Sequence, residues 1–385
     1  MINKNIVLIL IFISFTFIHA CSKNDSSDNK SNDSSDNKSC GGTALSLKNT
    51  SYENFKEIDL TPQNHPNGVG RDAVAYADFN QDGQIDMFVA TLTYWPPTTQ
   101  EAATGSNFEF YIKNCDGDFE KNNGYFSSSD TCIHPRKALV NDYNNDNLPD
   151  VFIICHGWDK NPYPGEKNKV LLSKSLGSYD LKDASSDVGF FHSGSSYDYN
   201  NDGHKDVILV NSSVNEKVRF YKNQGDGTFV NDNLSSREPT SVSGKSIYTI
   251  EMFDINGDSK LDMLLGGHEW SSNTNTQIYL NPGNDNFSSV NPDNITAITN
   301  EGVVLDFTVT KNNSTTNIWV LRTSGGDETF YQSRTIQKVS WPSLNSSTPV
   351  LDRSLNWIPW IIPSVIDGKN VITSDNKDNY FTLEY

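Results

Sequence analysis

Residues 198–206 read Asp198-Tyr199-Asn200-Asn201-Asp202-Gly203-His204-Lys205-Asp206. Asp or Asn occupies the first, third, fifth and ninth places of this stretch, and glycine occupies the sixth. Three further segments share the pattern at intervals of about 56 residues, and they begin at Asp78, Asp142 and Asp254. A repeat interval of this size is typical of an architecture that uses one structural unit several times.

Strand-like runs flank every loop. The third loop is followed by Val207-Ile208-Leu209-Val210, and an alternating hairpin pattern follows over residues 218–230. Short β-branched and aromatic runs between clusters of Gly, Asn and Asp indicate strands. Four strands per repeat predict an all-β fold, a β-propeller of four-stranded blades. The length of the repeat region predicts six blades, with seven as the alternative.

The two ends of the repeat region suggest how the ring closes. Residues 45–47 and 55–58 look like half of a blade, and residues 380–385 look like the missing half. Pairing N- and C-terminal strands would leave no open sheet edge. A fifth, eroded loop begins at Asp306, and a sixth repeat keeps only its apolar strand within residues 357–368.

The chemistry of the loops predicts calcium. Ca²⁺ prefers six to eight oxygen ligands, and alternating side chains of a tight loop point inward. The seventh place would add a backbone carbonyl, which explains why its side chain varies. The predicted ligands of about four Ca²⁺ ions are Asp78, Asn80, Asp82, Gln84 and Asp86; Asp142, Asn144, Asp146, Leu148 and Asp150; Asp198, Asn200, Asp202, His204 and Asp206; and Asp254, Asn256, Asp258, Lys260 and Asp262. The alternative is four solvated acidic turns.

This constellation resembles the FG-GAP/VCBS repeat of integrin-α-like propellers over most of the folded region. The match is strong at the four loops and weak after about residue 300. The resemblance implies a calcium ion in the loop between the first two strands of a blade, and a role in adhesion or recognition.

Composition excludes two classes of protein. The chain has 385 residues, 30 Lys and Arg against 48 Asp and Glu, and a formal net charge of −18. So acidic a chain is repelled by phosphate, which argues against a nucleic-acid partner. One long apolar stretch excludes a polytopic membrane protein, while 11% aromatic residues predict a real core.

The N-terminus resembles that of a bacterial lipoprotein. Residues 1–20 have an early Lys4 and a 13-residue apolar run from Ile6 to Ile18, which is typical of a signal peptide. Cys21 then occupies the place of the lipidated cysteine. We expect a lipid on Cys21 to be the chain's membrane contact and to hold it in the bacterial cell envelope. We expect the outer membrane, because the residue after Cys21 is Ser22 and not the Asp that is associated with inner-membrane retention in enteric bacteria. The alternative is a secreted protein cut near Ala20.

Residues 21–43 are rich in Ser, Asn and Asp and predict a flexible tether, and residues 44–385 form the predicted propeller. Apart from Cys21 the chain has four cysteines: Cys40, Cys115, Cys132 and Cys155. An oxidising compartment allows disulfides, and four cysteines allow three pairings. We favour Cys115–Cys132, because this pair brackets the outer hairpin of one blade.

The face opposite the calcium loops carries unusual side chains. His156 and Trp158 follow one loop at the same distance as His268 and Trp270 follow another. The candidate ligand-binding residues are Arg71, Trp95, His134, Arg136, His156, Trp158, His192, His268 and Trp270. Aromatic rings with scattered cations suit sugar or peptide binding. The alternative is that the Trp side chains pack between blades and the His side chains cap loops.

Two functions remain open from these residues. We favour a surface-anchored, calcium-stabilised propeller that binds an extracellular polysaccharide or protein. The rival is a hydrolase or lyase acting on polysaccharide, with His156, Asp159 and Glu166 as acid–base candidates beside His134 or His192. No Gly-x-Ser-x-Gly, zinc-ligand or phosphate-loop motif supports the enzyme, so a binding role is preferred over catalysis.

Overall fold

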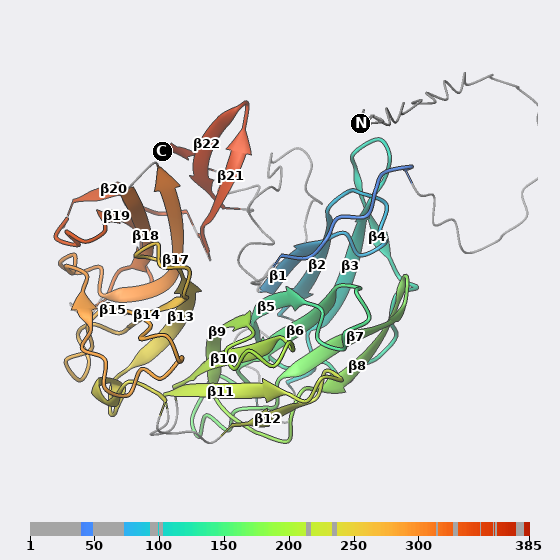
Figure 1. Cartoon of the computed structure of the whole chain (residues 1–385), viewed down its shortest axis with the longest axis horizontal. Helices are drawn as coiled ribbons and strands as arrows, with labels where there is room; N and C mark the ends of the chain where they lie inside the picture. The colour runs from blue at the N-terminus through green and yellow to red at the C-terminus, as the bar shows by residue number, and fades with distance from the viewer. Residues whose placement is uncertain are drawn as a thin grey trace, which may run out of the picture. The chain divides into compact units, whose positions relative to one another are not determined.

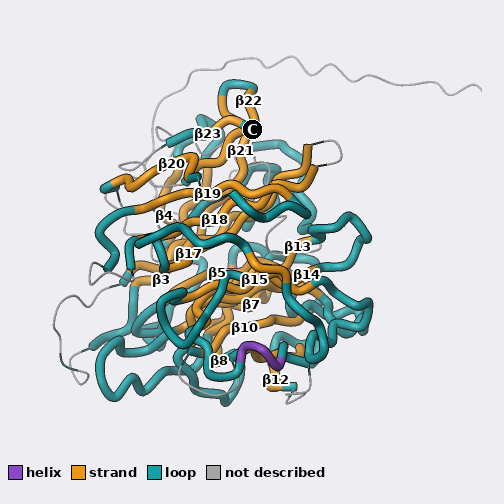
Figure 2. Tube along the Cα trace, turned by 90° about the vertical axis from the view of Figure 1, so that its left-hand side faces the viewer, coloured by secondary structure: helices purple, strands orange, loops and turns teal. Residues whose placement is uncertain are grey.

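A computed structural model describes residues 40–48, 73–92, 99, 103–212, 217–232, 237–312, 315–325, 330–346, 348–356, 358, 360–374 and 381–385. Six antiparallel sheets follow one another in chain order (Figure 1). Figure 2 shows almost only strand and loop. The helical element that the described residues contain is the 3₁₀ turn at Thr240–Val242. The fold is therefore all-β, and its six sheets are the blades of a β-propeller. No helix in the described part of the chain is long and apolar enough to cross a bilayer.

Each blade is a four-stranded meander in the first half of the ring. Blade 1 contains β1 (Ala73–Ala77), β2 (Asp86–Thr91), β3 (Asn107–Lys113) and β4 (Phe119–Asn122). Blade 2 contains β5 (Pro135–Asn141), β6 (Asp150–Cys155), β7 (Lys169–Ser175) and β8 (Ser178–Asp183). Blade 3 contains β9 (Phe191–Tyr197), β10 (Asp206–Asn211), β11 (Val218–Asn223) and β12 (Phe229–Asn231).

The second half repeats this order. Blade 4 contains β13 (Ile247–Phe253), β14 (Asp262–Gly267), β15 (Gln277–Tyr279) and β16 (Asp293–Asn294). Blade 5 contains β17 (Val303–Asn312), β18 (Thr315–Thr323), β19 (Arg334–Ser340) and β20 (Pro349–Ser354). Blade 6 has three strands within the described residues, β21 (Ile362–Ile366), β22 (Lys369–Thr373) and β23 (Leu383–Glu384).

The hydrophobic core lies between neighbouring blades, and strand alternation explains it. Successive side chains of a strand point to opposite faces of the sheet. In β1, Ala75 packs toward blade 2, while Val74 and Tyr76 pack on the other face of blade 1. Because both faces of a blade are covered, the inner strands are apolar throughout, as in Val207–Val210.

The last of these cores joins the two ends of the ring. Val74 and Tyr76 of blade 1 share a buried cluster with Ile362 of blade 6. The ring of Tyr76 lies 6.5 Å from that of Trp360. The ring is thus closed by packing between blades 1 and 6. Residues 55–58, predicted to complete the closing blade, lie outside the described residues.

Two sequence expectations, about residues 45–47 and about the fifth repeat, need correction. Residues 45–47 form no strand; the backbone N–H of Leu45 instead donates to Asp78 Oδ2 at 2.9 Å. The fifth loop does not begin at Asp306, because β17 and β18 pair as a long hairpin and place Asp306 at an irregularity inside β17.

The disulfide prediction is also wrong. The structure joins Cys40 to Cys115 and Cys132 to Cys155, not Cys115 to Cys132. Cys155 ends β6, and its partner in the sheet register is Pro135, a few residues after Cys132. The Cys132–Cys155 pairing therefore follows neighbours within one sheet, whereas the prediction considered only the loops that bracket a hairpin.

The strand order separates two faces of the propeller. In blades 1–4 the first strand runs toward the Asp-rich loop, and the second strand starts at the ninth residue of that loop: Asp86, Asp150, Asp206 or Asp262. The residues before each first strand and after each second strand therefore lie at the opposite ends of the strands. We call this end the entry face.

Candidate functional site

All four Asp-rich loops share three internal hydrogen bonds. In the third loop the Gly203 N–H donates to Asp198 at 2.9 Å, the Asp202 N–H donates to Asn200 at 2.9 Å, and the His204 N–H donates to Asp202 at 3.0 Å. The corresponding bonds recur in the first, second and fourth loops. The side-chain oxygens of the first, third and fifth places are thus gathered around one tight turn.

The ninth aspartate fixes the loop to its blade. Asp206 accepts the N–H of Tyr199 at 3.2 Å on one oxygen and the N–H of Asn223, from the end of β11, at 2.9 Å on the other. The ninth aspartates of the other loops accept equivalent pairs of N–H groups. All four of these aspartates are 0% exposed. The motif therefore defines the loop geometry before any ion binds.

The sixth place of each loop has a left-handed backbone. Gly83 and Gly203 have φ values of 87° and 90°, and Asn147 and Ser259 both have φ values of 67°. Glycine and, less readily, asparagine adopt this conformation at low cost. Ser259 therefore carries local strain at the position where the other loops use better-suited residues.

Burial disfavours the charge of the ninth aspartate of each loop and raises its pKa. Burial, with repulsion from Asp202 and Asp198, raises the pKa of Asp206 to about 7 against the lowering effect of its backbone hydrogen bonds. Burial likewise raises the pKa of Asp150 to about 7 and that of Asp262 to about 6. A divalent cation would relieve this repulsion. Asp206 Oδ1 accepts one N–H and keeps a lone pair for a metal, and the oxygen ligands of the loop are of the type that Ca²⁺ prefers.

The entry face carries a continuous row of rings. We call His134, His156, His192, Tyr248, His268, Trp270 and Phe330 the ring row. Consecutive members have centroid separations of 4.9, 4.2, 4.5, 4.1, 4.4 and 5.1 Å. The row crosses blades 2 to 5, so residues far apart in the sequence share one surface.

The repeat explains most of this row. The second residue of the first strand is Arg136 in blade 2, His192 in blade 3 and Tyr248 in blade 4. In each blade the residue before it pairs with the last residue of the second strand. His156 and His268 follow the second strand of their blades. The His156 N–H donates to the His134 carbonyl and the His268 N–H donates to the Ser246 carbonyl, both at 2.9 Å, and each acceptor directly precedes the first strand. The rings meet because successive blades place equivalent residues side by side.

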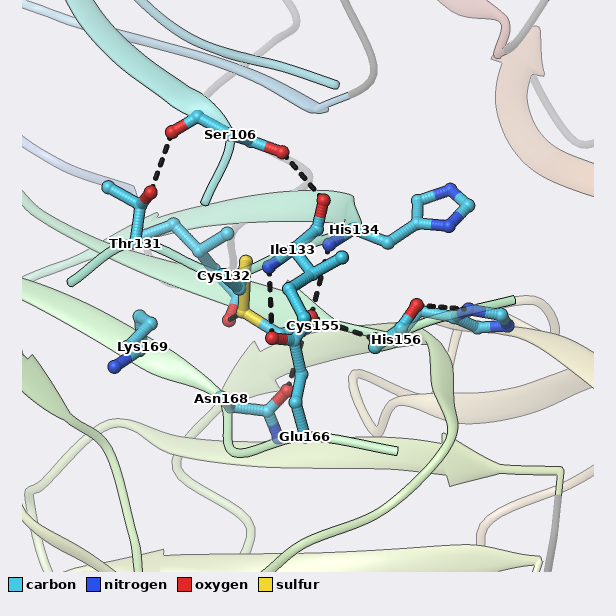
Figure 3. Close-up of a disulfide and its surroundings, with 12 residues drawn as sticks. Ser106, Thr131, Cys132, Ile133, His134, Cys155, His156, Glu166, Asn168 and Lys169 are labelled. Carbon is cyan, nitrogen blue, oxygen red and sulfur yellow. Dashed lines mark hydrogen bonds between the residues drawn. A yellow bond between two sulfur atoms is a disulfide. The ribbon is translucent and has the colours of Figure 1, made fainter. Parts of the chain in front are cut away.

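Glu166 holds the histidine-bearing segments of blade 2 together. Its carboxylate accepts the N–H groups of Ile133, His134 and Gly157 at 2.9, 3.1 and 2.8 Å. Figure 3 shows this carboxylate between the segment before β5 and the end of β6, next to the Cys132–Cys155 disulfide. Glu166 is therefore a positioning residue, since both oxygens face backbone donors.

Burial keeps the histidines of the ring row neutral. Burial, with a smaller contribution from Arg136, lowers the pKa of His134 to about 3. Burial lowers the pKa of His268 to about 4, and it lowers the pKa values of His156 and His192 well below their usual range. Neutral imidazoles offer one lone pair each, so these rings can act as hydrogen-bond acceptors or metal ligands.

The structure brings most of the predicted entry-face residues together. His134, Arg136, His156, His192, His268 and Trp270 lie in or beside the ring row, with Arg136 Nη1 3.3 Å from His134 Nε2. Trp158 is half-buried on the same face. Arg71 and Trp95 lie outside the described residues.

Sequence reasoning missed Tyr248 and Phe330. The signal for Tyr248 was its place one repeat after His192, which a comparison of equivalent positions would have found. Phe330 belongs to the divergent fifth blade and left no repeat signal.

Comparisons with known proteins agree with this architecture. Residues 198–265, which run from the third loop into β14, match the family model of the FG-GAP-like repeat. This segment of the chain is similar to the FG-GAP-like repeat. Comparison with curated proteins finds no similar sequence.

Solved structures show a distant likeness. A glycoside hydrolase is 10% identical, with 83% of this chain and 94% of that chain covered and a TM-score of 0.38. The Bombyx mori GH32 β-fructofuranosidase BmSUC1 is 12% identical, with coverages of 75% and 59% and a TM-score of 0.37. The Dos1 propeller is 9% identical, with coverages of 76% and 63% and a TM-score of 0.39. Likenesses this low carry no conclusion about function.

Proposed function

We propose that this chain is a calcium-stabilised propeller, held in the bacterial cell envelope by a lipid on Cys21, which binds an extracellular polysaccharide or protein through its entry face. The observation that carries the proposal is the ring row: side chains from four blades converge on the face away from the Asp-rich loops. Calcium supplies positive charge to loops that gather three carboxylates each.

Trp270 supports a sugar-binding surface. Its side chain is 38% exposed, and its ring stacks on His268 at 4.4 Å and 16°. A Cβ on Gly325 would lie 2.5 Å from Trp270 Cζ3, so the indole rests against bare backbone of blade 5. The indole thus packs against His268 and blade 5 while part of it stays exposed, and the exposed part can stack on a ligand.

Trp270→Ala tests the binding face. We expect loss of ligand retention in affinity electrophoresis on a polysaccharide panel, with a stability cost of only about 1–2 kcal/mol, because the ring is not fully buried. The matched control is Trp319→Ala, whose ring is 1% exposed. That variant should lose about 3–5 kcal/mol in urea denaturation and keep binding while folded. A Trp270→Ala variant that binds as wild type, or loses as much stability as Trp319→Ala, would contradict the proposal.

The acid–base candidates of the enzyme alternative are His156, Asp159 and Glu166, with His134 or His192. Of these, His134, His156 and Asp159 each have one ligand atom within 4.8 Å of the others. Such a cluster has the groups for acid–base chemistry on a bound polysaccharide. Product release from the same polysaccharide panel would favour this alternative, and retention without turnover would favour binding.

The lipid anchor is tested separately through Cys21. We expect Cys21→Ser to move the protein from the membrane fraction to the soluble fraction, because the thiol is the site of lipid attachment. Fractionation with metabolic palmitate labelling provides the measurement. Membrane retention of the variant, together with an unlabelled wild type, would exclude the anchor.

A further inference from the structure

We propose that the entry face holds a divalent transition-metal ion of the zinc class, with His134, His156 and Asp159 as its protein ligands. One ligand atom from each of these residues lies within 4.8 Å of the others. The site is separate from the four calcium loops, and the proposal stands whether or not the face binds a polysaccharide.

The ligand types select the metal. Two imidazole nitrogens with one carboxylate are a set that Zn²⁺ and its neighbours prefer, whereas Ca²⁺ takes oxygen ligands. Three protein ligands leave a fourth coordination position for water or a bound ligand. His134 and His156 are buried, and Asp159 is exposed, so the site has both a rigid base and access from solvent.

Both ring nitrogens of His156 have polar neighbours. His156 Nε2 lies 3.1 Å from His192 Nε2, so one of these nitrogens donates and the other accepts, and a metal on His156 Nε2 would replace this contact. The other ring nitrogen of His156 lies 3.4 Å from the Gly157 carbonyl, the kind of outer contact that orients a metal-binding imidazole. Figure 3 shows the rings of His134 and His156 extending to the same side of the Cys132–Cys155 disulfide.

The backbone around the cluster is already fixed. Glu166 bonds the N–H groups of His134 and Gly157, on either side of the site, and the His156 N–H donates to the His134 carbonyl at 2.9 Å. Arg136 lies beside His134 Nε2 and competes for one lone pair, but its side chain is exposed and can turn away.

A second cluster does not compete for this role. Cys132, Cys155 and Glu166 also lie within 4.8 Å of one another. However, the two sulfur atoms are joined in a disulfide and Glu166 is bound to backbone, so these groups are already committed.

Zinc and cobalt titration tests the proposal on the untagged full chain, stripped with chelator and refilled with excess calcium. We expect one equivalent of Zn²⁺ by calorimetry, and visible absorption of bound Co²⁺ typical of nitrogen ligands. Asp159→Asn and His134→Gln should each weaken Zn²⁺ binding at least about tenfold. The matched control His268→Gln, in the ring row but outside the cluster, should bind as wild type.

Melting curves in calcium show whether each variant is folded. We expect Asp159→Asn to melt as wild type, because Asp159 is exposed and its replacement leaves the core undisturbed. Absence of zinc binding by the wild type would overturn the site. So would equal zinc affinity in the wild type and a folded Asp159→Asn variant.

Discussion

Removal of calcium should lower the melting temperature of the chain by at least about 10 °C. A ligand that binds only the native state stabilises it, and one site filled at about 100 times its Kd contributes about 2.7 kcal/mol. Four sites then contribute on the order of 10 kcal/mol. The effect is large because the loops connect the inner strands of four successive blades. Thermal melts with EDTA and with excess calcium measure it.

The control for this prediction isolates a single loop. In calcium, Asp206→Asn should lower the free energy of unfolding by about 2–3 kcal/mol. In EDTA the difference in unfolding free energy between the variant and wild type should be smaller, because neither protein then binds calcium. Magnesium should restore much less stability than calcium, because Mg²⁺ demands a smaller octahedral site. An unchanged melting temperature in EDTA would contradict the calcium assignment.

Glu166→Ala should cost about 3 kcal/mol or more and disrupt the entry face. Three backbone N–H groups, those of Ile133, His134 and Gly157, lose their acceptor in this variant. A buried donor left unsatisfied costs about 1–3 kcal/mol. Urea denaturation measures the loss, and polysaccharide retention measures the effect on the face.

Glu166→Gln is the matched control for this change. It keeps the length of the side chain and one carbonyl oxygen, so we expect a smaller loss of stability. If Glu166→Ala unfolds within about 0.5 kcal/mol of wild type, a range typical of surface substitutions, then Glu166 does not hold these segments together.

The repeated loop made the fold predictable. Its spacing located the first hairpin of blades 1–4, and the apolar runs beside it located the inner strands. Blade 5 was harder, because its hairpin has no metal-loop pattern and extends past Asp306 before turning. Without the carboxylate pattern the sequence does not indicate where the hairpin turns, so the predicted fifth loop at Asp306 lies before the actual turn.

The entry face was predictable only in part. His156 and His268 stood out because the same residue recurs at one structural position, whereas Tyr248 differs in type from His192 and was overlooked. The disulfides depend on which segments lie side by side in three dimensions. Cys40 reaches Cys115 because the N-terminal segment runs along the first loop, where a Cβ on Gly42 would meet the Asp82 carbonyl at 2.2 Å.

Elemental analysis of the purified full chain tests the central claim most directly. After equilibration with calcium and removal of free ions, we expect about four calcium ions per chain, one for each Asp-rich loop of the repeat. Asp206→Asn should reduce this number by one and leave the other three sites filled. A wild-type chain that retains no calcium, or the same calcium content in the variant, would contradict the assignment of the loops as calcium sites.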